Sequence, residues 1–185
     1  MKKYAVWILI PGVFLLLQLL HNATESDLDL SEPKFLATDD AEIRFYNVRQ
    51  LSYDREERKD ASMRLFRYRR RPLWDSTTIT AQATLVISPL QDKAFVMLEL
   101  LGLPNRDTVH LQLVTSDSTA TLPFGQGSMV EHFQVAGAVY QTLEKDGAVF
   151  LTQPNGTNQP LLEGTQARDA YTATLEDFFK LVGLR

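Results

Sequence analysis

The strongest constraint on the fold is a regular alternation of apolar and polar residues over residues 77–88, TTITAQATLVIS. Successive side chains of an extended chain point to opposite sides, so every second residue falls on one face. The residues of one face are all apolar: Ile79, Ala81, Ala83, Leu85 and Ile87. This stretch therefore predicts a β-strand with one face in a hydrophobic core.

The flanking segments predict further strands, because each is short, rich in β-branched and aromatic residues, and bounded by turn residues. They are residues 42–53, 63–71, 93–103, 108–116 and three strands within 129–153. The last two of these are joined through Asp146-Gly147, a hairpin signal. Turns recur about every eight to twelve residues, which is typical of sandwiches and barrels. We expect a mainly β domain, an antiparallel β-sandwich.

The periodicity changes at the C-terminus, where an amphipathic stripe recurs at helical spacing. Its members are Ala167, Ala170, Tyr171, Thr174, Leu175, Phe178 and Val182. Gly183 follows as a stop signal. We expect a terminal helix over about residues 166–183 that packs across one sheet or closes one end of the sandwich.

An apolar run occupies residues 4–20, with Lys2 and Lys3 before it and acidic residues after it. Its length matches the shortest membrane-spanning helices, roughly 17 residues. The positive-inside rule then predicts a single-pass transmembrane helix, a signal-anchor, with its N-terminus in the cytoplasm. A cleaved signal peptide is the alternative, although a cut after Ala23 would place His21 at the third position before it, where a small residue is required.

Three regions follow from this pattern: an anchor at residues 1–20, an acidic tether at 21–40, and an exported domain at 41–185. The chain of 185 residues contains no cysteine, which excludes disulfides and thiolate metal sites. Packing alone must therefore stabilise the exported domain. The two-lysine start and the lack of cysteine favour a bacterial envelope, with the chain in the cytoplasmic (inner) membrane and the domain on the periplasmic or extracellular side.

Charge is segregated along the chain, whose formal net charge is −4. Residues 41–71 carry nine arginines and one lysine against five acidic residues, whereas the segments before and after are both net acidic. The segment RLFRYRRRP, residues 64–72, holds five of these arginines. Its candidate contact residues are Arg67, Tyr68, Arg69, Arg70 and Arg71.

The side chains of Arg67, Arg69 and Arg71 share one face of a strand, and we expect them to project together from it. Met63 and Leu65 share one face and Phe66 and Tyr68 the other, so keeping all four in one core would need a β-bulge near Leu65-Phe66. Three interpretations stay open: a solvated edge face, a docking surface for an acidic protein or anionic envelope polymer, or a contact with anionic lipid headgroups. Nucleic acid is disfavoured by the exported location.

Glu99 lies within the apolar segment VMLELLGL, so a central strand would bury its carboxylate. A buried carboxylate needs a cationic partner or has a raised pKa. A structural ion pair is one interpretation, with Arg44 or Arg49 as a candidate partner. A second is that the strand borders the edge of its sheet and Glu99 reaches water. A hydrolase or carbohydrate-active site that combines Glu99 with His110 or His132 is the alternative.

Neither histidine has the spacing of a metal motif, and no motif indicates a cofactor or a catalytic nucleophile. The sequence thus favours a membrane-anchored, extracytoplasmic, non-enzymatic accessory or scaffold module. We expect it to dock a partner protein or an anionic polymer through the basic strand. The alternative is the anchored hydrolase with Glu99 at its site.

Overall fold

A computed structural model describes residues 28–75, 77–103, 108–125, 127–153 and 156–185. The predicted anchor at residues 4–20 and the first part of the predicted tether lie outside this described part. Among the described residues, no helix combines the length and the apolar character needed to cross a membrane.

The first of two antiparallel sheets has the strand order β1-β2-β3-β4. Its strands are β1 (Tyr53–Arg58), β2 (Met63–Tyr68), β3 (Thr80–Ser88) and β4 (Lys93–Leu101). The alternating segment forms β3, and Ala81, Ala83, Leu85 and Ile87 are buried on its inner face as predicted. β4 is its neighbour along the full length of the strand.

The second sheet has the order β6-β5-β7-β8, again antiparallel. Its strands are β5 (Val109–Val114), β6 (Thr119–Phe124), β7 (Ala148–Thr152) and β8 (Asn158–Leu161). With two antiparallel sheets and the C-terminal helix α4 (Thr165–Leu181), the described chain confirms the mainly β prediction and the position of the terminal helix.

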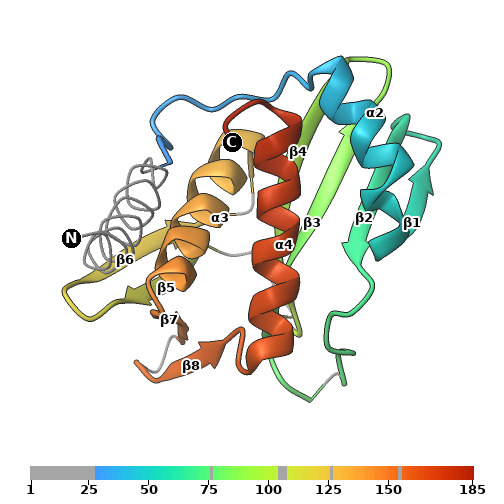
Figure 1. Cartoon of the computed structure of the whole chain (residues 1–185). Helices are drawn as coiled ribbons and strands as arrows, with labels where there is room; N and C mark the ends of the chain where they lie inside the picture. Colours follow the sequence, from blue (N-terminus) through green and yellow to red (C-terminus); the bar gives the residue numbers. More distant parts are fainter. Residues whose placement is uncertain (1–27, 76, 104–107, 126, 154–155) are drawn as a thin grey trace, which may run out of the picture.

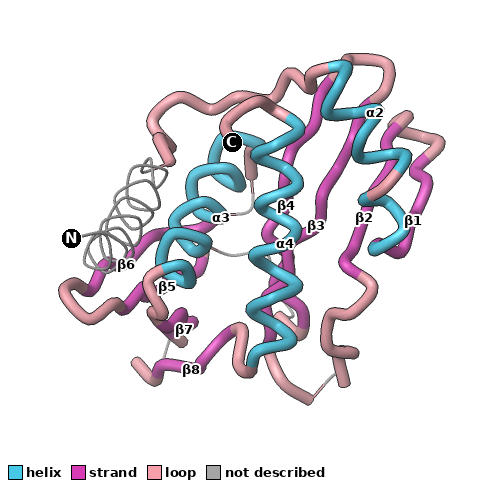
Figure 2. Tube along the Cα trace, viewed as in Figure 1, coloured by secondary structure: helices cyan, strands magenta, loops and turns pink. Residues whose placement is uncertain are grey.

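Two helices, α3 (Met129–Glu144) and α4, run side by side across one face of the first sheet (Figures 1 and 2). α3 packs on β4 and also touches the second sheet, while α4 packs mainly on β3. The β-sandwich expectation placed a second sheet over the first. In the described residues the covering layer is helical instead, because residues 129–144 are not strands.

The prediction of strands within residues 129–144 is wrong, and the sequence carried the contrary signal. Ser128 is the N-cap of α3, and its Oγ accepts a hydrogen bond from the Glu131 N–H at 3.1 Å. A Ser-x-x-Glu pattern is a capping box, which marks the start of a helix. The buried residues that follow it, such as Phe133, Ala136 and Tyr140, recur at helical spacing.

The strand predicted over residues 42–53 is also wrong. This segment forms α2 (Asp39–Asn47) and a short 3-10 helix, η1 (Arg49–Ser52). Three acidic residues occupy the first turn of α2: Asp39, Asp40 and Glu42. Negative charge there is stabilised by the helix dipole, and this local effect outweighs the aromatic content that suggested a strand.

The expected bulge near Leu65 is absent, because the two faces of β2 serve different apolar clusters. Phe66 enters the main core between sheet and helices, whereas Leu65 packs with Val86 and Phe95 on the opposite face. Pairing of β2 with β1 and β3 continues through both residues without interruption. Each apolar side chain is therefore buried without a change of register.

Residues 28–38, here called the N-terminal strap, pack on the domain although the sequence places them in a tether. Leu28 is 8% exposed, and its carbonyl oxygen accepts a hydrogen bond from Gln141 of α3. Farther along, backbone hydrogen bonds join Phe35 and Ala37 to the β3–β4 turn region and Thr38 to the end of α4. The chain therefore enters the domain beside α3.

Two glycines, Gly137 in α3 and Gly147 before β7, give a matched test of how closely other atoms pack against them. A Cβ at Gly147 would lie 2.5 Å from the Val114 carbonyl oxygen and 2.7 Å from that of Thr142, whereas a Cβ at Gly137 would meet only the side chain of Leu30. We expect Gly147→Ala to lower the free energy of unfolding by about 2–3 kcal/mol, because backbone atoms cannot move aside.

For Gly137→Ala we expect a change within about 1 kcal/mol, because the helix propensity of alanine offsets the displacement of Leu30. Urea unfolding followed by circular dichroism measures both variants. Equal losses in the two variants would contradict the close backbone approach at Gly147.

Candidate functional site

The basic segment forms the β1–β2 hairpin, with β1 at the edge of the first sheet (Figure 1). Tyr53 pairs with Tyr68 and Asp54 with Arg67, so acidic and basic side chains face each other across the hairpin. Five of the six β1 residues are exposed. Whether each arginine forms an internal ion pair then depends on which acidic side chain the strand register places beside it.

Arg67 lies over the outer face of the sheet, opposite the helices. Its guanidinium donates to both carboxylate oxygens of Glu99, at 2.9 and 3.1 Å, and to Glu56 at 2.7 Å. The side chain is 23% exposed. Arg67 was expected to project outward as a contact residue, but its hydrogen-bonding capacity is directed at two carboxylates of its own domain.

Glu99 forms the structural ion pair that its apolar surroundings require, with Arg67 rather than Arg44 or Arg49 as the partner. Thr84 and Gln82 of β3 also donate to its Oε2. Burial alone would raise the pKa of Glu99. The hydrogen bonds from Arg67, Thr84 and Gln82 outweigh that effect and hold the pKa of this carboxyl below its ordinary value.

Asp54 of β1 binds two more arginines of the segment. Arg71 donates from Nη1 to its Oδ2 at 2.8 Å and to the Tyr68 carbonyl at 2.8 Å, while Arg69 approaches Oδ1 at 3.4 Å. The hydrogen bond from Arg71 lowers the pKa of Asp54. Arg71 is 24% exposed and holds the end of the hairpin together, whereas Arg69 is 61% exposed.

Arg70 is exposed and has no acidic partner among the described residues. Just beyond it, Leu73 is 92% exposed and Trp74 is 45% exposed. We call Arg69, Arg70, Leu73 and Trp74 the docking corner. Sequence reasoning missed its apolar half, although the letters RPLW directly follow the arginines.

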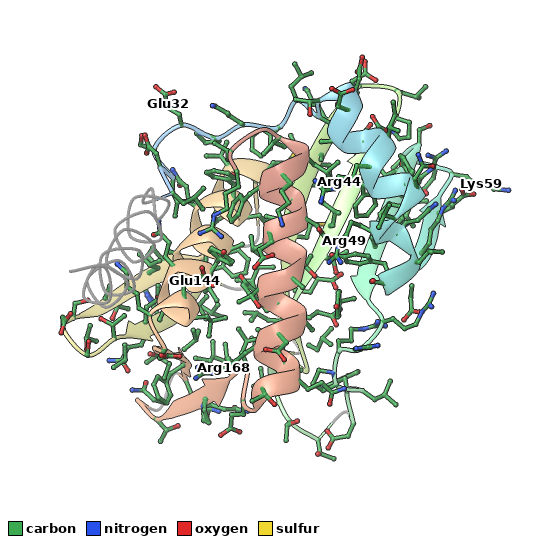
Figure 3. The ribbon with its side chains drawn as sticks, viewed as in Figure 1. Glu32, Arg44, Arg49, Lys59, Glu144 and Arg168 are labelled. Atoms are coloured by element: carbon green, nitrogen blue, oxygen red, sulfur yellow. The ribbon has the colours of Figure 1, made fainter. Side chains whose placement is uncertain are left out.

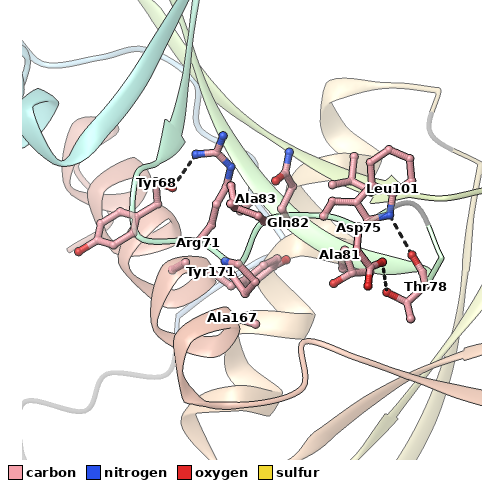
Figure 4. A pocket seen from close by; sticks show the side chains of 15 residues that line it. Tyr68, Arg71, Asp75, Thr78, Ala81, Gln82, Ala83, Leu101, Ala167 and Tyr171 are labelled. Atoms are coloured by element: carbon pink, nitrogen blue, oxygen red, sulfur yellow. Dashed lines mark hydrogen bonds between the residues drawn. The ribbon is translucent and has the colours of Figure 1, made fainter.

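Tyr68 points to the helix side of the sheet, where its ring meets that of Tyr53 edge to face at a centroid distance of 5.4 Å. It is half-buried and forms one wall of a pocket that α4 and residues 71–75 complete (Figure 4). Of the five predicted contact residues, the structure thus exposes Arg69 and Arg70 and engages Arg67, Tyr68 and Arg71 internally, although Arg69 also contacts Asp54 and donates to the Tyr53 carbonyl at 3.1 Å.

A second buried ionic group connects η1 to α4 and was not predicted. Arg49 donates to both oxygens of Asp177, at 2.8 and 2.9 Å, and the Tyr53 hydroxyl donates to the same carboxylate at 2.7 Å (Figure 3 labels Arg49). Burial raises the pKa of Tyr53, and the charge of Asp177 adds to that effect. The available signal was an acid at helical spacing from Ala170 and Thr174 on the apolar stripe of α4.

The two candidate histidines, His110 and His132, lie apart from the hydrogen-bond network of Glu99. His132 is buried in α3, where its Nδ1 accepts a hydrogen bond from the Leu98 N–H at the edge of β4. His110 is exposed on β5 of the second sheet. In the described part of the chain, no group of three or more His, Cys, Asp or Glu side chains could hold a metal ion.

No family model matches the chain, and searches of curated proteins and of solved structures found no significant match.

The Arg67–Glu99 pair gives a pH-dependent prediction. Because the pKa of Glu99 is lower in the folded chain than its ordinary value of 4.5, the ionised carboxylate stabilises the fold above that value. This contribution is lost as the pH falls through the lowered pKa. We expect Glu99→Gln to lower the free energy of unfolding by about 2–4 kcal/mol near pH 7, because Arg67 loses its charged partner.

Between about pH 7 and about pH 3, wild type should then lose more stability than Glu99→Gln, since the variant lacks this titration. Urea unfolding at a series of pH values measures the difference. Glu163→Gln, at an exposed position, is the control and should follow wild type. Parallel loss of stability in wild type and Glu99→Gln would contradict the role of the ionised pair.

Proposed function

We propose that this chain is a membrane-anchored, extracytoplasmic, non-enzymatic docking module of a bacterial cell envelope. Residues 4–20 are the anchor, and the domain binds a partner through the docking corner. The observation that carries the proposal is the exposure of Arg69 and Arg70 beside Leu73 and Trp74. Arginine and tryptophan are the residue types that most often dominate binding energy at protein interfaces.

The internal ion pairs refine the proposal. Arg67 and Arg71 already bind carboxylates of the domain, so using them for a partner would leave Glu99 or Asp54 without its cation. Arg69 is mostly exposed, and Arg70 has no acidic partner in the described part of the chain. Arg70 can therefore bind a partner's carboxylate without breaking an internal ion pair. Arg69 would give up its 3.4 Å contact with Asp54 and its hydrogen bond to the Tyr53 carbonyl, but Asp54 would keep Arg71 as its cation.

The place where the chain enters the domain supports a protein partner over lipid. The strap begins on α3, which packs against β4, whereas the hairpin lies at the β1 edge (Figure 1). The strap also reaches the C-terminal end of α4, where the Thr38 N–H donates to the Leu181 carbonyl, whereas Gln166 near the N-terminal end of α4 donates to the Arg70 carbonyl. An anchor that leads into the strap therefore leaves the docking corner at the opposite end of α4, away from its own attachment.

The docking corner can be tested with paired variants of the full chain. We expect Arg69→Ala/Arg70→Ala to weaken capture of the native partner by about 30-fold or more, because buried interface arginines contribute about 2 kcal/mol or more. Arg58→Ala/Lys59→Ala removes the same charge from the exposed far end of the hairpin and should have little effect. Affinity is measured by titrating the purified partner.

A photoreactive residue at Leu73 identifies that partner by cross-linking and mass spectrometry. The same residue at Leu90, which is 80% exposed in the β3–β4 turn, is the control. A partner cross-linked equally from both positions, or retained by Arg69→Ala/Arg70→Ala, would contradict docking at this corner.

The anchor has its own test. We expect the full-length chain to remain in membranes after an alkaline carbonate wash, and Leu15→Arg/Leu17→Arg to release it, because each arginine at a helix centre costs about 2.5–3.5 kcal/mol. Leu51→Arg, at an exposed position of η1, is the matched control. A shortened chain in intact-mass analysis, or release of the wild type by the wash, would contradict an uncleaved anchor.

A further inference from the structure

A pocket of about 120 Å³ lies beside the docking corner, between the ends of β3 and β4, residues 71–75 and the first half of α4 (Figure 4). Its apolar floor is made of small side chains: Ala81, Ala83, Ala167 and Ala170. Three aromatic residues, Tyr68, Trp74 and Tyr171, line it as well. Alanines at these four positions leave a volume that larger side chains would have filled.

The polar atoms of two of the three aromatic side chains are hydrogen-bonded outside the pocket. The Trp74 indole N–H donates to the Thr78 carbonyl at 2.9 Å, and the Tyr171 hydroxyl donates to the Ala136 carbonyl at 3.1 Å. Asp75, also in the lining, accepts hydrogen bonds from Thr77 and Thr78. The pocket therefore offers ring faces and alanine methyl groups to an occupant beside the polar residues Thr80 and Gln82. A cavity of this order holds one aromatic ring.

Around the pocket, arginines outnumber the one acidic lining residue, Asp75. Arg71 lines it, and Arg69 and Arg70 precede Arg71 directly in the chain. Gln166 at the start of α4 donates to the Arg70 carbonyl at 2.8 Å, which fixes the docking corner against the helix that forms the pocket floor. An apolar cavity and exposed guanidinium groups are thus held side by side.

We propose that this pocket binds one aromatic or large apolar side chain of an acidic partner segment, whose flanking carboxylates bind Arg69 and Arg70. The proposal rests on the proposed docking function and specifies the chemistry of its partner. Burial of the anchor side chain supplies affinity, and the arginines select for acidic neighbours. A basic segment with the same anchor would meet like charge at the rim.

Trp74 reports occupancy directly, because the chain has two tryptophans and Trp7→Phe leaves Trp74 alone. The full chain carrying Trp7→Phe, in phosphatidylcholine nanodiscs, is titrated to about 1 mM, the weak end of specific recognition, with the blocked peptide Asp-Glu-Phe-Asp-Glu. We expect a saturable change in Trp74 emission. The peptides Asp-Glu-Ala-Asp-Glu and Lys-Lys-Phe-Lys-Lys should each bind about tenfold more weakly or not at all.

Ala167→Leu fills the pocket, and Ala120→Leu on the exposed surface of β6 is the matched control. With the fold verified by circular dichroism, Ala167→Leu should weaken the phenylalanine peptide about tenfold, while Ala120→Leu should bind it as the parent does. Equal binding of the alanine peptide, equal binding of the lysine peptide, or no emission change up to the highest concentration would overturn the proposal.

Capture of the native partner, once cross-linking has identified it, distinguishes the docking proposal from the pocket proposal. If Arg69→Ala/Arg70→Ala releases that partner and Ala167→Leu retains it, docking at the corner stands and the pocket proposal fails. If neither variant releases it, the docking function itself fails. Release by both variants, with retention by Ala120→Leu, supports both.

Discussion

The inner face of the first sheet depends on the two helices that cover it. Phe66, Leu85 and Leu98 on that face are at most 2% exposed, and Phe133 of α3 and Phe178 of α4 are fully buried. Burying each such side chain contributes about 1.5–3 kcal/mol, so this layer dominates the stability of a domain that has no disulfides. The strap, the edge hairpin and the second sheet all take their positions from α3, α4 and the sheet between them.

Within that framework, ionic pairing decides which arginines are left for a partner. The outer face of the sheet brings Glu99 under Arg67, and the hairpin brings Asp54 beside Arg71. Both carboxyls have a lowered pKa, as expected for acids that accept hydrogen bonds from arginine. Of the run of five arginines, Arg70 has no acidic partner in the described part of the chain and Arg69 is mostly exposed despite its contacts with Asp54 and the Tyr53 carbonyl, whereas Arg67 and Arg71 maintain the hairpin that presents them.

The docking corner and the pocket lie next to each other because residues of α4 contact both. Gln166 binds the backbone at Arg70, while Ala167 and Ala170, one and four residues later, form part of the pocket floor. A partner that placed an apolar side chain in the pocket would bring its neighbouring residues to Arg69 and Arg70. Affinity would then come from desolvation in the pocket and selectivity from charge at its rim.

Local patterns in the sequence were sufficient to predict the strands β2–β5 and the helix α4, because side-chain periodicity directly reflects which face is buried. They also indicated a structural ion pair as one interpretation for Glu99, although with Arg44 or Arg49 rather than Arg67 as the partner. Ser128 and Glu131 signalled the helix over residues 129–144, but the β-branched and aromatic residues of this segment led to a strand prediction instead.

Only the tertiary structure decided which arginine meets Glu99, which acids neutralise the basic segment, and that Leu73 and Trp74 stay exposed beside it. These outcomes depend on strand register and on the packing of α4, which join residues far apart in the chain. The sequence by itself determined how many charged and apolar residues the domain carries. The pairing of strands and the packing of α4 determined which of those residues lie side by side.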